Sequence, residues 1–206
     1  MPRSKRILFP DACYHVFNRG ISKKTIVFSE THKLFFLHLL DSMTLQFDVK
    51  IMAYCLMTNH YHILVQTPKA NLNKAMHYFG SHFARQINRD LNADGSLFRD
   101  RYKSLLVDTD SYLLQVSRYI HLNPVEANLV SKPEDYTWSS YASYLNQELA
   151  TSDTFLKKMP ILSYFKDDND YQYFVNQGID KVTQEFYSSK KKKSIIGTKE
   201  FIKKFR

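Results

Sequence analysis

Two histidines, His60 and His62, stand at alternate positions of the chain. Apolar runs at 51–57 and 61–65, separated by a short polar break, predict two strands of which the second carries both histidines. Alternate residues of a strand project from the same face, so the two imidazoles lie together. Neutral imidazoles in this arrangement could hold a divalent metal ion. The alternative interpretation is a half-buried histidine pair that binds no metal.

A phenol and an amide, Tyr119 and Asn123, form the second candidate group. The apolar spacing of 111–122 predicts a helix, with Asp110 as its candidate N-cap and Pro124 as the residue that ends it. Residues four apart lie on one side of a helix, so the two side chains are presented together. A phenol can act as a nucleophile, and an amide oxygen can serve as a neutral metal ligand.

Five segments in a fixed order resemble the single-tyrosine HUH transposases (His-hydrophobe-His endonucleases) of the smallest bacterial insertion sequences. Within that family the chain is most similar to the domesticated REP-associated tyrosine transposases. The resemblance extends as far as about Leu145 and rests on Tyr14-His-Val-Phe-Asn-Arg-Gly20, Ala53-Tyr-Cys-Leu-Met-Thr-Asn-His-Tyr-His62, Leu97-Phe-Arg-Asp-Arg-Tyr-Lys-Ser104, Arg118-Tyr-Ile-His-Leu-Asn-Pro-Val125 and Asp135-Tyr-Thr-Trp-Ser-Ser-Tyr141.

This resemblance implies that His60 and His62 bind a metal ion and that Tyr119 attacks DNA. It implies Asn123 as the third ligand, where other branches of the family carry Gln. His121 lies two positions from the tyrosine and is expected to point elsewhere. Mg²⁺ or Mn²⁺ suits a site completed by phosphate and water oxygens. Attack by the tyrosine would give a 5′-phosphotyrosine and a free 3′-OH, which allows strand transfer as well as cleavage.

The implied substrate is single-stranded DNA with a nearby hairpin, of the kind formed by bacterial repetitive extragenic palindromes. A formal net charge of +9 is consistent with a polyanionic partner. The candidate DNA contacts are basic residues distributed along the chain, namely Arg3, Lys5, Arg6, Arg19, Arg85, Arg101 and Lys103. Two alternatives remain open at this point: a DNA- or RNA-hairpin binding protein that does not cut, and a metal-dependent nuclease that uses water.

The fold class expected from these patterns is α+β, a ferredoxin-like antiparallel sheet with packed helices and the tyrosine helix added after its last strand. The expected elements are strand 14–18, helix 30–47 capped by Ser29, the two strands around the histidines, helix 71–92, strand 97–107 and the tyrosine helix. The basic face of helix 71–92 is a candidate path for DNA beside the metal site.

Two regions are expected: a transposase-like domain at 1–145, and a helical basic extension at 146–206 that packs on it and contains the run Lys190–Lys193. Cys13 and Cys55 lie in apolar runs and are expected to be packed, reduced thiols. No stretch has the length of a membrane span, and no signal sequence is evident. We therefore expect a cytoplasmic, nucleoid-associated protein, either a monomer or a homodimer, that does not bind a membrane.

Overall fold

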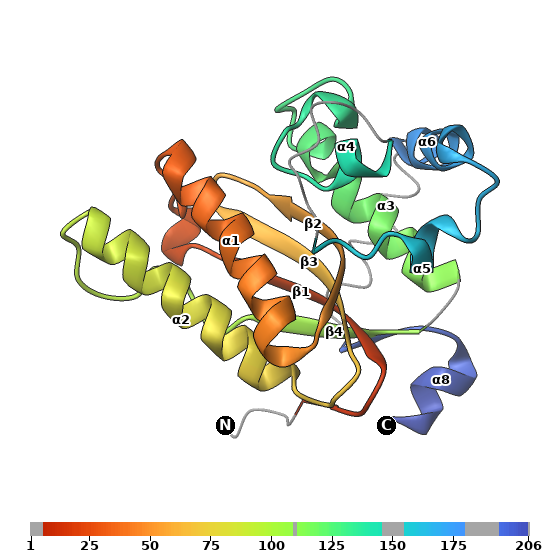
Figure 1. Ribbon diagram of the computed structural model, residues 1–206, viewed down its shortest axis with the longest axis horizontal. Coiled ribbons are helices and arrows are strands. Elements are labelled where there is room, and N and C mark those ends of the chain that lie inside the picture. Colours follow the sequence, from red (N-terminus) through yellow and green to blue (C-terminus); the bar gives the residue numbers. More distant parts are fainter. Residues whose placement is uncertain (1–5, 109–110, 146–154, 180–193, 206) are drawn as a thin grey trace.

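The computed structural model describes residues 6–108, 111–145, 155–179 and 194–205. Within these residues one sheet has the strand order β2-β3-β1-β4-β5 (Figure 1). Its strands are β1 (Ala12–Arg19), β2 (Lys50–Leu56), β3 (His60–Thr67), β4 (Lys103–Val107) and β5 (Ile195–Ile196). The α-helices are α1 (Glu30–Phe47), α2 (Leu72–Asp90), α3 (Ser111–Glu126), α4 (Tyr141–Tyr144), α5 (Met159–Leu162), α6 (Asp168–Asn176) and α8 (Lys199–Lys204).

The first four strands have the ferredoxin-like arrangement. Strand β1 pairs antiparallel with β3 on one side and with β4 on the other, and β3 pairs antiparallel with β2. Together with α1 and α2 they follow the order β-α-β-β-α-β, so the predicted α+β fold is confirmed. The short strand β5 was not predicted. It runs parallel to β4 and makes the sheet mixed rather than purely antiparallel.

Helices α1 and α2 cover one face of the sheet, and α3 packs against the other face, on β2 and β3 (Figure 1). Aromatic rings pack between the sheet and the helices α1 and α2. Phe36 lies 5.2 Å from Phe79, and Phe79 lies 5.4 Å from Tyr61, measured between ring centroids. Because Tyr61 projects toward α1 and α2, its neighbours His60 and His62 project toward α3. None of the described helices is long and apolar enough to cross a lipid bilayer.

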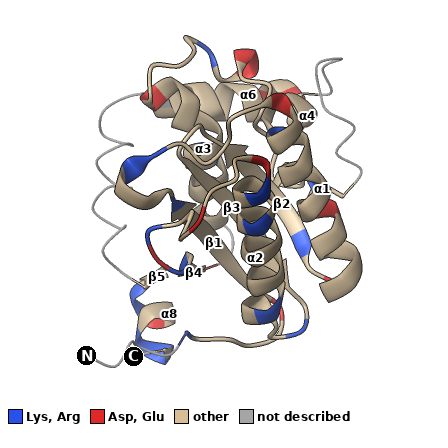
Figure 2. Ribbon diagram, turned by 90° about the vertical axis from the view of Figure 1, so that its left-hand side faces the viewer, with Lys and Arg blue, Asp and Glu red and all other residues tan. Residues whose placement is uncertain are grey.

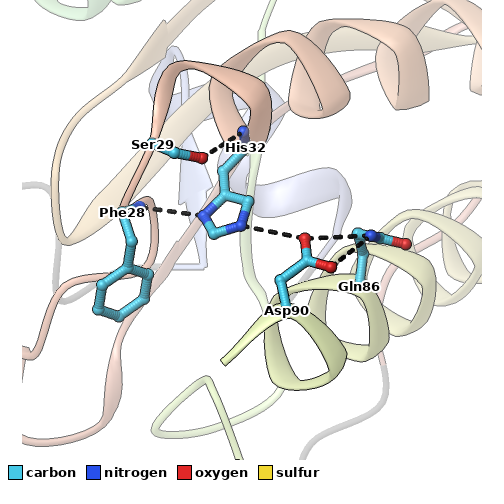
Figure 3. Close-up of polar contacts among 5 residues, drawn as sticks. All are labelled: Phe28, Ser29, His32, Gln86 and Asp90. Atoms are coloured by element: carbon cyan, nitrogen blue, oxygen red, sulfur yellow. Dashed lines mark hydrogen bonds and ion pairs between the residues drawn. The ribbon is translucent and has the colours of Figure 1, made fainter. Parts of the chain in front are cut away.

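The N-terminus of α1 is tied to the C-terminus of α2 by a buried histidine (Figure 3). Ser29 caps α1 as predicted, because its hydroxyl accepts from the amide of His32. The His32 ring accepts from the Phe28 amide at Nδ1, and its Nε2 lies 3.1 Å from a carboxylate oxygen of Asp90. A backbone amide can only donate, so Nδ1 carries no proton and His32 is the neutral, Nε2-protonated form. The contact fixes the segment that enters α1.

Most element boundaries differ from the prediction by one or two residues, and two elements differ by more. The expected strand at 97–107 is regular only as β4, and before it Phe98 forms an isolated bridge to Gly20. Charged residues interrupt the apolar alternation there, which explains the shorter strand. The expectation that Pro124 ends its helix is wrong, since α3 continues through Pro124 to Glu126. The proline lies in the last turn, where its missing amide removes only one helical hydrogen bond.

Segments that follow α3 cover both outer edges of the sheet. The amide of Leu56 on β2 donates to Trp138, and Ile51 on β2 forms a bridge with Leu156. On the opposite edge, β4 is covered by β5. Unpaired strand edges are sites of aggregation, so these short contacts protect the sheet.

Helix α6 holds α3 in place through buried polar contacts. The hydroxyl of Tyr171 lies 2.8 Å from Nδ1 of His121, and Nε2 of the same ring lies 2.8 Å from the hydroxyl of Ser140. Burial lowers the pKa of His121 to about 3, so the ring is neutral. Just after α6, a Cβ atom added to Gly178 would lie 2.6 Å from Cδ of Arg118, so a larger residue there would displace the Arg118 side chain on α3.

We expect Tyr171→Phe to destabilise the protein by about 1–3 kcal/mol, because it leaves Nδ1 of the buried His121 without that hydroxyl. The matched control is Tyr173→Phe on the same helix, where the ring is 67% exposed and the change should stay within about 0.5 kcal/mol. Urea unfolding followed by circular dichroism measures both free energies. Equal stability of the two variants would contradict a structural role for the buried hydroxyl.

Candidate active site

The register of β1 with β3 assembles one face of the site. Arg19 pairs with His60, and Phe17 pairs with His62. Residues directly opposite in an antiparallel pair project from the same face, so these four side chains stand together on the face that α3 approaches. His15 lies two positions before Phe17 and joins the same row.

The two predicted metal histidines are close neighbours. Their ring centroids lie 5.2 Å apart, with the ring planes nearly perpendicular. Nδ1 of His60 lies 2.6 Å from the side-chain oxygen of Asn59, and Nδ1 of His62 lies 2.8 Å from Nε2 of His15. His62 and His15 are buried, whereas His60 is partly exposed to solvent. Hydrogen bonds therefore orient both rings. The site opens toward solvent on the side of His60.

Helix α3 brings Tyr119 to the histidines of the same chain. Its ring centroid lies 5.5 Å from that of His62 and 5.8 Å from that of His15, edge-on in both cases. Asn123 follows one turn later and donates its side-chain amide to the carbonyl of Tyr119, at 2.8 Å. Both residues are largely buried, with Tyr119 only 3% exposed. The phenol and the histidine pair thus meet between α3 and the sheet, as the family resemblance implied.

The surroundings of Tyr119 keep its phenol protonated. Burial raises the pKa of Tyr119 well above its usual value, and the negative charge of Glu126 raises it further. A hydrogen bond from Asn123 acts in the opposite direction. The balance favours the neutral phenol at physiological pH, so a reaction at this oxygen must remove its proton as the new bond forms.

Two other residues near the site are engaged with other partners. Cys55 pairs with His62 across β2 and β3, and its buried thiol lies 3.6 Å from the sulfur of Met57. His121 points away from the histidine pair, toward Ser140 and Tyr171, as expected from its position on the helix. Cys13 and Cys55 are both buried and reduced, as predicted.

The family model described as "Transposase IS200 like" matches residues 9–123 of this chain. That span begins just before β1, ends at Asn123 and contains both histidines and Tyr119. The chain belongs to the IS200-like transposase family. The family resemblance carried by the five sequence motifs is thereby confirmed.

Two relatives show how far this IS200-like transposase resembles known proteins. A Haemophilus influenzae protein, described as a REP-associated tyrosine transposase, is 25% identical over 118 residues, which cover 52% of this chain and 67% of that protein. A solved structure of a REP-associated tyrosine transposase bound to a REP hairpin aligns with a TM-score of 0.60 and 14% identity. That alignment covers 74% of this chain and 90% of the other, and it supports the fold.

The side chains of this IS200-like transposase that could hold a divalent cation are His60, His62 and Asn123. The described residues contain no cluster of three His, Cys, Asp or Glu side chains that could hold a metal ion. Among the described residues, a third protein ligand beside His60 and His62 would be a neutral oxygen, and Asn123 could supply one from α3, which packs against β3. These three ligands would add no negative charge and would leave coordination positions on the cation for phosphate and water oxygens.

The predicted DNA contacts are distributed over separate parts of the transposase, and only some of them are near the site. Arg19 on β1 pairs with His60, and Lys103 on β4 pairs with Phe17, so both share the histidine face. Arg101 is exposed just before β4. Arg6 is engaged elsewhere, with its guanidinium 3.9 Å above the ring of Tyr102.

The expectation that the basic face of the second helix borders the metal site is wrong. Arg85 is exposed on α2, which covers the opposite face of the sheet, and Figure 2 shows further basic positions on α2 and α8. Arg3, Lys5, the candidate cap Asp110 and the run Lys190–Lys193 lie outside the described residues.

Sequence reasoning missed two members of the site, His15 and Phe17. The ring of Phe17 is partly exposed and lies 5.6 Å from that of His62. The signal was present in the alternation of His15, Phe17 and Arg19, which places them on one face of a strand. It could not be used without knowing that this strand pairs with the histidine strand.

Proposed function

We propose that this IS200-like transposase is a metal-dependent single-stranded DNA endonuclease and strand transferase that acts at hairpins through a 5′-phosphotyrosine intermediate. The observation that carries the proposal is the edge-on contact of Tyr119 with His62 at 5.5 Å between ring centroids. A nucleophile next to a histidine pair is an arrangement that suits such chemistry.

In the proposed reaction, the phenol oxygen of Tyr119 attacks the phosphorus of a DNA phosphodiester. A bond forms between this oxygen and phosphorus, the bond from phosphorus to the 3′ oxygen breaks, and the 3′ oxygen leaves as a hydroxyl after gaining a proton. A divalent cation held by His60, His62 and Asn123 would act as a Lewis acid toward the charge that develops on the phosphate oxygens. Because the phenol starts neutral, its proton must leave as the new bond forms.

The covalent bond to Tyr119 conserves the energy of the phosphodiester. Attack by a 3′-OH can therefore reverse the step and join a new strand without ATP. Strand transfer is therefore part of the proposed activity, beside cleavage.

A DNA hairpin with an unpaired flank is the proposed substrate. The structural relative bound to a REP hairpin motivates this choice, together with the exposed basic residues Arg19 and Lys103 on the histidine face. The partly exposed ring of Phe17 lies between them and could stack on an unpaired base. Phosphate contacts would position the hairpin, and the flank would be read beside the histidines.

Two alternatives lead to different products. A hairpin-binding protein that does not cut would give only a shifted band in native gels, and the burial of Tyr119 is the observation that favours it. A nuclease that uses water would give shortened DNA without a covalent adduct. A denaturing gel with labelled hairpin DNA separates both from the proposed reaction, which leaves DNA attached to the protein.

Tyr119→Phe should reduce formation of the covalent adduct by at least about a thousandfold, because it removes the attacking oxygen. The ring remains, so packing and hairpin binding should persist. Tyr112→Phe is the matched control, since Tyr112 lies on the same helix about two turns earlier and should be dispensable. An adduct that survives in the Tyr119 variant but disappears in the Tyr112 variant would show that the nucleophile is misassigned.

Cleavage should require Mg²⁺ or Mn²⁺, stop on addition of EDTA, and be lost in His60→Ala and His62→Ala. Asn123→Ala should be milder and restored by excess Mn²⁺, because water can replace one neutral oxygen ligand. His82→Ala is the control, since this ring is bound to the Tyr78 carbonyl on α2, away from the site. Undiminished cutting in EDTA would rule out metal-assisted chemistry.

Hairpin affinity should fall with salt, and the slope of log affinity against log salt should decrease by about 0.7–0.9 for each phosphate contact removed. Arg19→Ala and Lys103→Ala are each expected to show this change in fluorescence anisotropy titrations. The control is Lys74→Ala, because Lys74 is exposed on α2, on the other face of the sheet. Equal slopes for all three variants would place the DNA elsewhere on the protein.

A further inference from the structure

Both predicted metal histidines are hydrogen-bonded through the same ring nitrogen. Nδ1 of His60 lies 2.6 Å from the side-chain oxygen of Asn59, and Nδ1 of His62 lies 2.8 Å from Nε2 of His15. A neutral imidazole has one N–H group and one lone pair. The partner of Nδ1 therefore decides whether Nε2 carries a proton or presents a lone pair to a cation.

The orientation of the Asn59 side chain is fixed by the loop that follows β1. Its amide nitrogen donates to the carbonyl of Lys23, at 3.1 Å, which directs its oxygen toward His60. An amide oxygen only accepts hydrogen bonds, so Nδ1 of His60 must carry the proton. In the neutral ring, Nε2 then holds the lone pair.

The loop approaches the histidine turn closely enough to keep Asn59 in this position. The amide of Gly20 donates to the Asn59 carbonyl at 2.9 Å, and the amide of Ile26 donates to the Thr58 carbonyl at 2.8 Å. A Cβ atom added to Gly20 would lie 2.1 Å from the carbonyl oxygen of Lys24, so the loop can fold back only because this residue is glycine. The contact to Lys23 is thus built into the backbone.

The contact between His15 and His62 has two possible directions, and only one allows cation binding. If His15 donates from Nε2, His62 must carry its own proton on Nε2, where it cannot bind a cation. If His62 donates from Nδ1, its Nε2 keeps the lone pair, and His15 carries its proton on Nδ1. His15 is fully buried on β1, so its ring is held in place by packing.

We propose that Asn59 and His15 are positioning residues that hold His60 and His62 in the Nδ1-protonated tautomer, so that both present Nε2 to a divalent cation. The role of the cation and the direction of the hydrogen bond between His15 and His62 rest on the proposed function, whereas the His60 tautomer follows from the Asn59 contact alone. Partners of this kind orient metal-binding histidines, and their removal typically lowers metal affinity by about ten- to a hundredfold.

The tautomers can be observed directly. Two-dimensional NMR spectra of the metal-free protein labelled with ¹⁵N in histidine distinguish a protonated ring nitrogen from an unprotonated one. At a pH where the rings are neutral, both His60 and His62 should be protonated at Nδ1 and unprotonated at Nε2. Protonation of either ring at Nε2 would overturn the inference.

Matched variants test the two partners through cation affinity, measured by calorimetric titration with Mn²⁺. Asn59→Asp keeps an accepting oxygen and should bind Mn²⁺ nearly as well as the original protein, whereas Asn59→Leu should bind about ten- to a hundredfold more weakly. His15→Gln retains an acceptor and should be milder than His15→Leu. His82→Gln on α2 is the control and should leave affinity unchanged.

The same measurements separate this inference from the proposed function. Protein with both rings protonated at Nδ1 that fails to bind Mn²⁺ would overturn the metal chemistry while supporting the tautomers. Protein that binds Mn²⁺ equally well after Asn59→Leu and His15→Leu would overturn the inference and leave the metal chemistry intact. Should His15→Leu fail to fold, the NMR spectra and the His15→Gln titration still decide the role of His15.

Discussion

Antiparallel pairing of β1 with β3 is the interaction on which the site depends. The pairing places Phe17 opposite His62 and Arg19 opposite His60, and it brings His15 within hydrogen-bonding distance of His62. A slip of one residue would turn the histidines toward α1 and α2, where Tyr61 now packs. The aromatic core on that side opposes such a slip, because it accepts the Tyr61 ring between Phe79 and Phe98. Packing on the face under α1 and α2 thus determines which side chains of β3 project toward α3.

The rotation of α3 depends on polar contacts on its far side. Side chains two positions apart on a helix are rotated by about 200° around the helix axis, so they project to nearly opposite sides. His121 is bound by Ser140, which is itself hydrogen-bonded to the outer edge of β2, and by Tyr171 of α6, and Tyr119 consequently faces the histidines. The segments after α3 therefore contribute to the site without supplying a reacting group, although they lie beyond the residues matched by the family model.

Much of this arrangement could be predicted from local patterns. Helix 30–47, its cap at Ser29 and the buried face of α2 follow from apolar spacing and side-chain chemistry, which are properties of neighbouring residues. The association of Tyr119 with His62 followed from five ordered motifs. The contacts of His15 and the position of Arg85 could not be foreseen, because they depend on which strands pair and which face each helix covers. Strand β5 is two residues long and has no pattern that marks it before its pairing with β4 is known.

The covering of the sheet edges also sets an order of events during synthesis. The strands and helices from β1 to β4 leave the ribosome first, and domains begin to fold from their N-terminal parts. At that stage the outer edges of β2 and β4 lack the partners that residues 138–140, 156–157 and 194–196 later provide. Helix α3 emerges before Tyr171, which fixes its rotation in the finished protein. A nascent chain can therefore pair its histidine strand before the helix that carries Tyr119 has gained its support, and the site is assembled only after the chain has been synthesised past Tyr171.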